Sequence, residues 1–134
     1  MNRERGASSL ALVLLLLVLG SLMLQGLNQM QRRQVAMVND ETLALRNTAQ
    51  AHSTLQWGKT VSWPDGVDVQ CRAYSGGSRA CLRLLDHGAI LLMADSNGIQ
   101  LWQSGARQIN GIVFSPHGWS DFCPLQEKAL CQMP

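Results

Sequence analysis

Charge is what the N-terminal part of the sequence most clearly lacks. After Arg5 the next charged residue is Arg32, so the 26 residues from Gly6 to Gln31 carry no formal charge. Within them lies an apolar run, Leu10 to Leu24. A long uncharged apolar stretch is typical of a segment that enters a membrane.

A signal-peptidase cleavage site is lacking as well. A secretory signal has a shorter apolar region followed by a small-residue A-x-A site. Here the run leads into Leu24-Gln25-Gly26-Leu27-Asn28-Gln29, without that pattern and without a cysteine for lipid attachment. Removal as a signal peptide is therefore disfavoured. Two fates stay open: a plain transmembrane anchor, or a segment trimmed on its cytoplasmic side and kept as a helix.

Proline and glycine are absent from Gln29 to Trp57, and most residues there are tolerated in helices. We therefore expect the membrane helix to continue to Gly58. Gly58 and the following Trp63-Pro64-Asp65-Gly66 are expected to end it. Apolar residues recur at helical spacing and predict a stripe that rests on the folded domain. The members of this stripe are Val38, Leu45, Ala49, His52 and Leu55.

Beyond Gly66, short apolar runs separated by turn residues predict an antiparallel sheet. The expected strands are Val67 to Tyr74, Ala80 to Leu85, Ala89 to Ala94, Ile99 to Gln103 and Ile109 to Phe114, separated at Gly76-Gly77, Asp86-His87-Gly88, Asn97-Gly98 and Gly105. Residues 80–93 also suit a helical period, but His87-Gly88 interrupts it. Residues 115–134 are expected to form a stapled loop that begins with the turn Ser115-Pro116-His117-Gly118.

The four cysteines all follow the apolar segment: Cys71, Cys81, Cys123 and Cys131. Four cysteines permit three pairings, and pairing nearest neighbours closes a hairpin and a short C-terminal loop. The short C-x2-4-C clasp usual for structural zinc is lacking. Disulfides persist in oxidising compartments, so we expect a cytoplasmic N-terminus and a periplasmic domain. Arginines on both sides of the apolar segment do not decide the orientation.

Catalytic motifs are lacking too. Ser115, His117 and Asp121 contain the residue types of a hydrolase triad, but no G-x-S-x-G elbow surrounds the serine. No phosphate loop, dinucleotide fingerprint or metalloprotease motif is present, and no basic patch suggests nucleic acid. We therefore expect a protein that is not an enzyme, with no cofactor and no metal. Trp102 is expected in the core, and the place of Trp119 stays open.

A short leader with basic residues, a glycine at its end and then a small residue precede the apolar helix. This arrangement resembles a type IV prepilin. The match is more specific to the prepilin-peptidase-dependent minor pilin group typified by YgdB, and it covers nearly the whole chain. The matching segments are Met1-Asn2-Arg3-Glu4, Ser8 to Val13, Cys81 to Leu85, Phe114 to Pro116 and Gly118 to Leu125.

The resemblance implies cleavage by a prepilin peptidase between Gly6 and Ala7, with methylation of the new N-terminus at Ala7. Major pilins carry Glu at the fifth mature position, where this chain has Ala11. In lacking this glutamate, the chain resembles the minor pseudopilins that cap a fibre tip. Expected partners are the peptidase, other minor pilins and the major pilin, which would be contacted through the N-terminal helix.

The expected architecture is α+β, with a long helix packed on a small antiparallel sheet. Its parts would be a cytoplasmic leader (1–6), a transmembrane half-helix (7–28), an amphipathic half-helix (29–58) and a periplasmic, disulfide-stapled β domain (59–134). The expected function is to initiate or cap a type IV pilus-like fibre or a type II secretion pseudopilus from the inner membrane. The alternative is a bitopic inner-membrane protein that binds another envelope protein and never enters a fibre.

Overall fold

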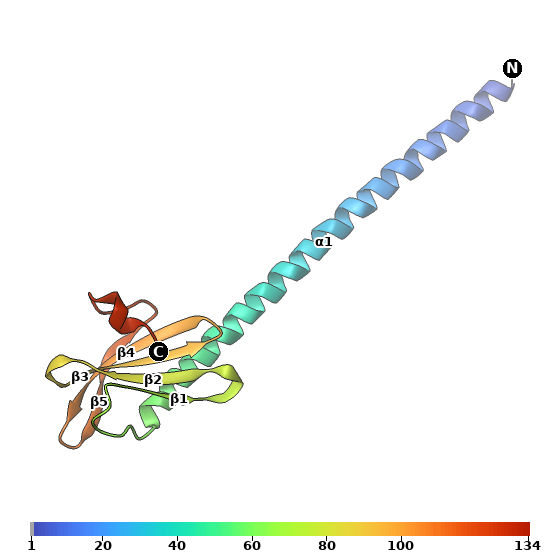
Figure 1. The fold of residues 1–134 in the computed structure, drawn as a ribbon. Helices are drawn as coiled ribbons and strands as arrows, with labels where there is room; N and C mark the ends of the chain where they lie inside the picture. The colour runs from blue at the N-terminus through green and yellow to red at the C-terminus, as the bar shows by residue number, and fades with distance from the viewer. Residues whose placement is uncertain (1) are drawn as a thin grey trace. The chain divides into compact units, whose positions relative to one another are not determined.

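A computed structural model describes residues 2–134 as one long helix followed by a five-stranded sheet (Figure 1). The sheet is antiparallel throughout, and its strand order follows the chain. The expected α+β fold class is confirmed. The elements are α1 (Asn2–Thr60), β1 (Val69–Ala73), β2 (Arg79–Leu84), β3 (Ala89–Ser96), β4 (Ile99–Gln108) and β5 (Gly111–Ser120), with short 3-10 turns at Ser75–Gly77, Asp86–Gly88 and Lys128–Cys131.

Helix α1 ends at Thr60, two residues later than expected. Gly58 does not terminate it: a Cβ at this position would lie 3.2 Å from the Cβ of Ala80 and 3.1 Å from a methyl group of Leu92. The glycine therefore allows the helix to approach the sheet closely. Termination comes next, where the indole Nε1 of Trp63 donates to the Gly58 carbonyl at 2.8 Å, satisfying one of the last carbonyls of the helix.

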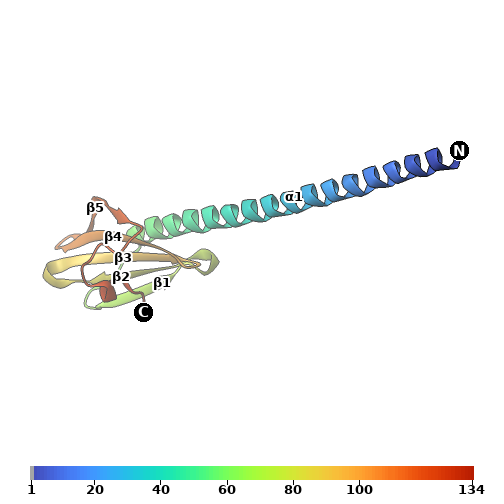
Figure 2. The same ribbon diagram turned by 90° about the horizontal axis from the view of Figure 1, so that it is seen from above.

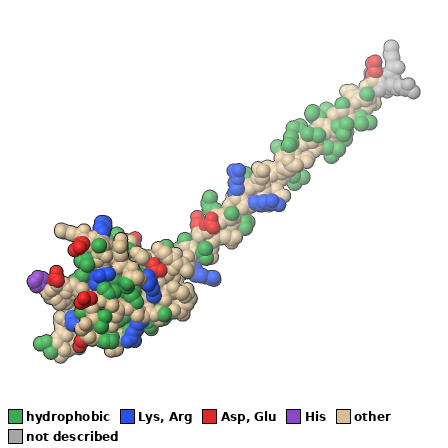
Figure 3. All heavy atoms as spheres, viewed as in Figure 1, with side chains coloured by type: hydrophobic (Ala, Val, Ile, Leu, Met, Phe, Trp, Pro, Cys, Tyr) green, Lys and Arg blue, Asp and Glu red, His purple; other side chains and the backbone are tan. Residues whose placement is uncertain are grey.

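The chain divides into two compact units, residues 1–43 and 44–134. In the first unit, all residues from Glu4 to Leu43 are exposed. Apolar side chains gather along much of this unit, and the basic side chains drawn along it come after the uncharged stretch that ends at Gln31 (Figure 3). In the described part of the chain, α1 is the one helix long and apolar enough to cross a membrane.

In the second unit, the last turns of α1 lie against one face of the sheet (Figure 1, Figure 2). Ala51 and Leu55 are buried there, together with Thr54. The expected apolar stripe was partly wrong, because Leu45 and Ala49 are exposed, as is Val38 in the first unit. The buried face also includes Thr54 and Gly58, and neither of these residues belongs to an apolar periodic pattern. On the sheet side the core consists of Ala80, Leu82, Ile90, Leu92, Ala94 and Leu101.

The opposite face of the sheet is covered by the C-terminal segment. Leu91, Met93 and Trp102 are buried there against Cys131, with Leu125 packed beside them, so the expectation that Trp102 is core is confirmed. Three side chains of the sheet donate hydrogen bonds to carbonyls of the segment. These bonds are Arg79 to Pro134 at 2.8 Å, Arg83 to Gln132 at 3.0 Å and Trp102 to Cys131 at 3.2 Å.

Both disulfides join nearest neighbours in the sequence. Cys71 pairs with Cys81 across β1 and β2, and Cys123 pairs with Cys131 in the C-terminal segment. Of the three pairings that the sequence permitted, the structure therefore selects the one that closes the two shortest loops.

Residues 80–93 form β2, a turn and β3 rather than a helix. His87 and Gly88 both have positive φ, at 59° and 78°, so the helical alternative fails where the sequence suggested an interruption. The two-residue turn Asn97-Gly98 has φ of 50° and 86°. That geometry favours glycine and asparagine and suits a tight hairpin.

The end of the sheet differs from the expectation. β4 continues to Gln108 through Gly105, and β5 runs to Ser120 through the expected turn at 115–118. The register moves from Gln103↔Trp119 to Gly105↔Phe114, so four residues of β5 lie opposite Ser104 alone. This bulge breaks the period of two, and the pattern therefore looked like the end of the sheet.

Candidate functional site

The predicted processing positions lie in the first unit. Gly6, Ala7 and Ala11 are all exposed residues of α1. A Cβ built at Gly6 would meet nothing within 4 Å. In the described structure, no neighbouring segment shields the predicted junction.

The apolar residues that follow are exposed in the part of the chain that the structure describes. The large apolar side chains from Leu10 to Leu27 are 50% to 75% exposed. A Cβ at Gly20 or Gly26 would also meet nothing within 4 Å. Monomeric soluble proteins rarely expose a contiguous apolar surface of this extent. This surface is consistent with a helix that crosses a membrane.

A groove of about 520 Å³ lies in the second unit, beside α1. It forms because β5 ends at Ser120, opposite Trp102, while β4 begins three residues earlier at Ile99. The indole of Trp119 is 52% exposed at the groove. The other lining residues are Thr48, His52, Gly98, Ile99, Gln100, Leu101, Trp102 and Asp121.

An aromatic pair joins α1 to β5 at the groove. The rings of His52 and Trp119 meet edge to face, with their centroids 5.0 Å apart. Aromatic pairs prefer such an arrangement, and it is worth about 0.5–1.5 kcal/mol beyond area burial. Helix and strand thus position the Trp119 ring, which the sequence left open between core and surface. The sequence signal for this groove was Trp119 itself, which lay in a segment that was expected to be a loop.

The residues that suggested a hydrolase lie on or next to β5. Ser115 and His117 belong to the bulge and are exposed, and Asp121 follows the strand. The Ser115 carbonyl accepts a hydrogen bond from Gln103 Nε2 at 2.8 Å. Among the hydrogen bonds of residues 2–134, none joins Ser115, His117 and Asp121 to one another. Their closeness in sequence does not become a triad in this structure.

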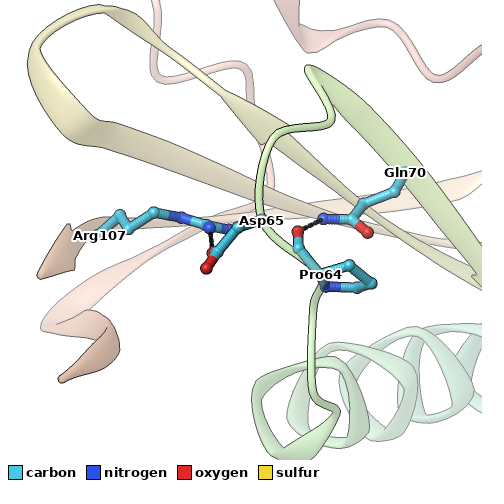
Figure 4. A network of polar contacts seen from close by, with 4 residues as sticks. All are labelled: Pro64, Asp65, Gln70 and Arg107. Carbon is cyan, nitrogen blue, oxygen red and sulfur yellow. Dashed lines mark hydrogen bonds and ion pairs between the residues drawn. The ribbon is translucent and has the colours of Figure 1, made fainter. Parts of the chain in front are cut away.

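A smaller hollow, of about 270 Å³, lies where the connection after α1 meets the β4–β5 hairpin. Asp65 pairs with Arg107, and Gln70 Nε2 donates to the Pro64 carbonyl at 2.8 Å (Figure 4). Asp65 is 90% exposed, so this pair is worth little in free energy. We interpret the cluster as a tie that holds residues 64–65 against β1 and β4.

The part of the chain that the structure describes contains no group of three or more His, Cys, Asp or Glu residues placed to hold a metal ion. The cysteines are the softest metal ligands in the sequence, and all four are in disulfides. Two features therefore remain as candidates for function, namely the uncovered apolar part of α1 and the Trp119 groove.

The family model described as "Protein of unknown function (DUF2509)" matches residues 15–131, and the chain belongs to this family. No curated protein matches the chain. No solved structure matches it either. The matched range covers most of α1, the whole sheet and both disulfides.

Proposed function

We propose that this member of the DUF2509 family is a minor pilin or pseudopilin, which helps to initiate or cap a type IV pilus-like fibre or a type II secretion pseudopilus. One observation carries the proposal. A single unbroken helix, α1, exposes an apolar surface along its first unit and buries Ala51 and Leu55 in the sheet at its other end. The role is non-catalytic.

The division of α1 supports this role physically. Leu10 to Leu27 is 18 residues, which at about 1.5 Å per residue gives roughly 27 Å, close to the thickness of a bilayer's hydrocarbon core. The same surface suits packing against the apolar helices of other subunits. A helix of this kind serves first as an anchor in the inner membrane and later as a contact within a fibre.

The proposed topology places the N-terminus in the cytoplasm and the sheet in the periplasm. Its support is chemical, because both disulfides belong to the second unit and disulfides persist in oxidising compartments. In this scheme a prepilin peptidase cuts between Gly6 and Ala7 on the cytoplasmic side, and Ala7 is then methylated.

Ala11 favours a special position in the fibre. A carboxylate at this place in a pilin pairs with the N-terminal amine of a neighbouring subunit, and alanine offers no such partner. A subunit at the tip has no neighbour above it that requires the pair. We therefore place this protein among the minor pilins at the tip.

Intact-mass measurement of the chain, expressed with and without a prepilin peptidase, tests the proposal. The expected product with the peptidase lacks Met1 to Gly6 and carries one added methyl group. Gly6→Val should block the cut, while the matched change Gly20→Val in the same helix should leave it intact. An unprocessed N-terminus in the presence of the peptidase would contradict the proposal.

A photo-crosslinking residue at Ser21 or Gly26 separates a fibre subunit from a bitopic membrane protein. Both positions lie in the exposed apolar part of α1. A fibre subunit should crosslink there to other pilins in cells that assemble pili. Crosslinks confined to lipid or to proteins that are not pilins would favour the bitopic alternative.

A further inference from the structure

We propose that the Trp119 groove is a binding site for a neutral oligosaccharide. Sugar rings present an apolar C–H face surrounded by hydroxyl groups. A fitting site therefore has an accessible aromatic ring with hydrogen-bonding groups around it. This inference goes beyond the proposed assembly role and does not depend on how the N-terminus is processed.

The aromatic element is the ring of Trp119. It is 52% exposed, and His52 holds it by an edge-to-face contact with centroids 5.0 Å apart. Leu101, at 2% exposure, lies in the floor, whereas Trp102 also lines the groove but packs its indole against Cys131 on the other face of the sheet. A ring that is fixed in position and still open to solvent can stack on a flat ligand with little loss of conformational freedom.

Hydrogen-bonding groups surround this ring. His52, Gln100 and Asp121 line the groove, and within residues 2–134 none of their side chains has a hydrogen-bond or salt-bridge partner. The start of β4 adds backbone groups, because the pairing with β5 reaches only Trp102 and leaves the β5-side edge of residues 99–101 open. Donors and acceptors without partners are the groups that fix the orientation of a ligand.

The charge of the lining defines the ligand further. Asp121 is the one carboxylate among the lining residues, and they include no lysine or arginine. An acidic sugar would meet like charge there without a compensating cation, whereas a neutral sugar can donate hydroxyl hydrogen bonds to the carboxylate. The groove volume of about 520 Å³ is within the usual range for small-molecule sites, roughly 300–1,000 Å³. The site should thus prefer short neutral oligosaccharides over acidic ones.

The test is a calorimetric titration of the full chain in micelles of a detergent without a sugar headgroup. The probes are cellotetraose and tetra-N-acetylchitotetraose, which are neutral, and a hyaluronan tetrasaccharide, which is acidic. At least one neutral probe should bind saturably, and the acidic probe should bind more weakly. Trp119→Ala should lower the affinity for the neutral probe by about tenfold or more, as expected when a stacking ring is removed.

Phe122→Ala is the matched control, because Phe122 is 67% exposed and is not among the lining residues. It should leave the affinity unchanged. If Trp119→Ala alters the unfolding curve, the rim variants Gln100→Ala and Asp121→Asn provide the same comparison without removing an aromatic ring. The proposal fails if neither neutral probe binds, if Phe122→Ala weakens binding as much as Trp119→Ala, or if hyaluronan binds as tightly as the neutral probes. Failure would favour a protein segment as the occupant of the groove.

Discussion

Leu15 and Leu55 are both leucines in helix α1, yet the Leu15 side chain is 58% exposed and the Leu55 side chain is 1% exposed. Both fit α1 equally well, because helix propensity depends on the residue and its near neighbours. The difference between them comes from what lies next to the helix. Leu55 packs against the sheet, whereas Leu15 is exposed among the residues that the structure describes. The two parts of one helix can therefore require different surroundings.

The largest expected effect separates these two leucines. Leu55→Ala removes a side chain packed against the sheet and should lower the free energy of unfolding by about 2–5 kcal/mol. Leu15→Ala should leave the unfolding of the sheet domain unchanged, because Leu15 contributes nothing to its core. Urea denaturation of both variants in micelles measures this. Equal losses would show that the first part of α1 also stabilises the domain.

The disulfides give the next effect, since both lie in the second unit. Replacing Cys123 and Cys131 with serine should cost about 2–3 kcal/mol of stability on the loop-entropy model. It should also loosen the C-terminal segment from the sheet, because the Cys131 carbonyl accepts the Trp102 indole hydrogen bond. The measurements are the urea midpoint and the hydrogen exchange of the Trp102 indole N–H. The paired change of Cys71 and Cys81 to serine is the control, which should lower stability without releasing that segment.

Two glycine-to-alanine substitutions, one in the sheet and one in the first unit, compare how much stability each region loses when one methyl group is added. A Cβ at Gly105 would lie 2.7 Å from the Val113 carbonyl oxygen and 3.1 Å from the Phe114 Cα. Gly105→Ala should therefore destabilise by about 1–3 kcal/mol through forced backbone shifts. Gly20→Ala, where a Cβ meets nothing within 4 Å, should cause no loss. Thermal unfolding of both variants is the check, and a neutral Gly105→Ala would mean that β4 and β5 can separate there.

The smallest effect concerns the ion pair at the connection after α1. Asp65→Asn should change stability by less than about 1 kcal/mol, because the Asp65 side chain is almost fully exposed. Asp68→Asn, at an exposed residue just before β1, is the control, and unfolding midpoints at low and high salt measure both. A clearly larger loss for Asp65→Asn would show that the Arg107 pair does more than hold the connection in place.

The features that followed from local sequence were predicted well. The long helix follows from the lack of proline and glycine between Gln29 and Trp57, and the hairpin turn at Asn97-Gly98 follows from residues that accept positive φ. The bulge in β5 was missed because four residues lie opposite one, and such a pairing leaves no regular period. The buried face of α1 was misplaced because Thr54 and Gly58 belong to it.

For the candidate sites the same division holds. The uncharged stretch from Gly6 to Gln31 can be read from the sequence, because a bilayer selects length and apolarity along a single segment. The groove cannot be read in this way. It depends on His52 of the helix meeting Trp119, 67 positions later in the sequence, and on the place where β5 stops beside β4.

The uncharged apolar segment, the extent of the long helix and the even number of cysteines all follow from the amino-acid sequence alone. These properties depend on neighbours along the chain. The buried face of α1, the pairing of the cysteines and the exposure of the Trp119 ring beside the helix follow only from the folded structure. Those outcomes depend on contacts between residues far apart in sequence, and such contacts are set when the helix and the sheet pack together.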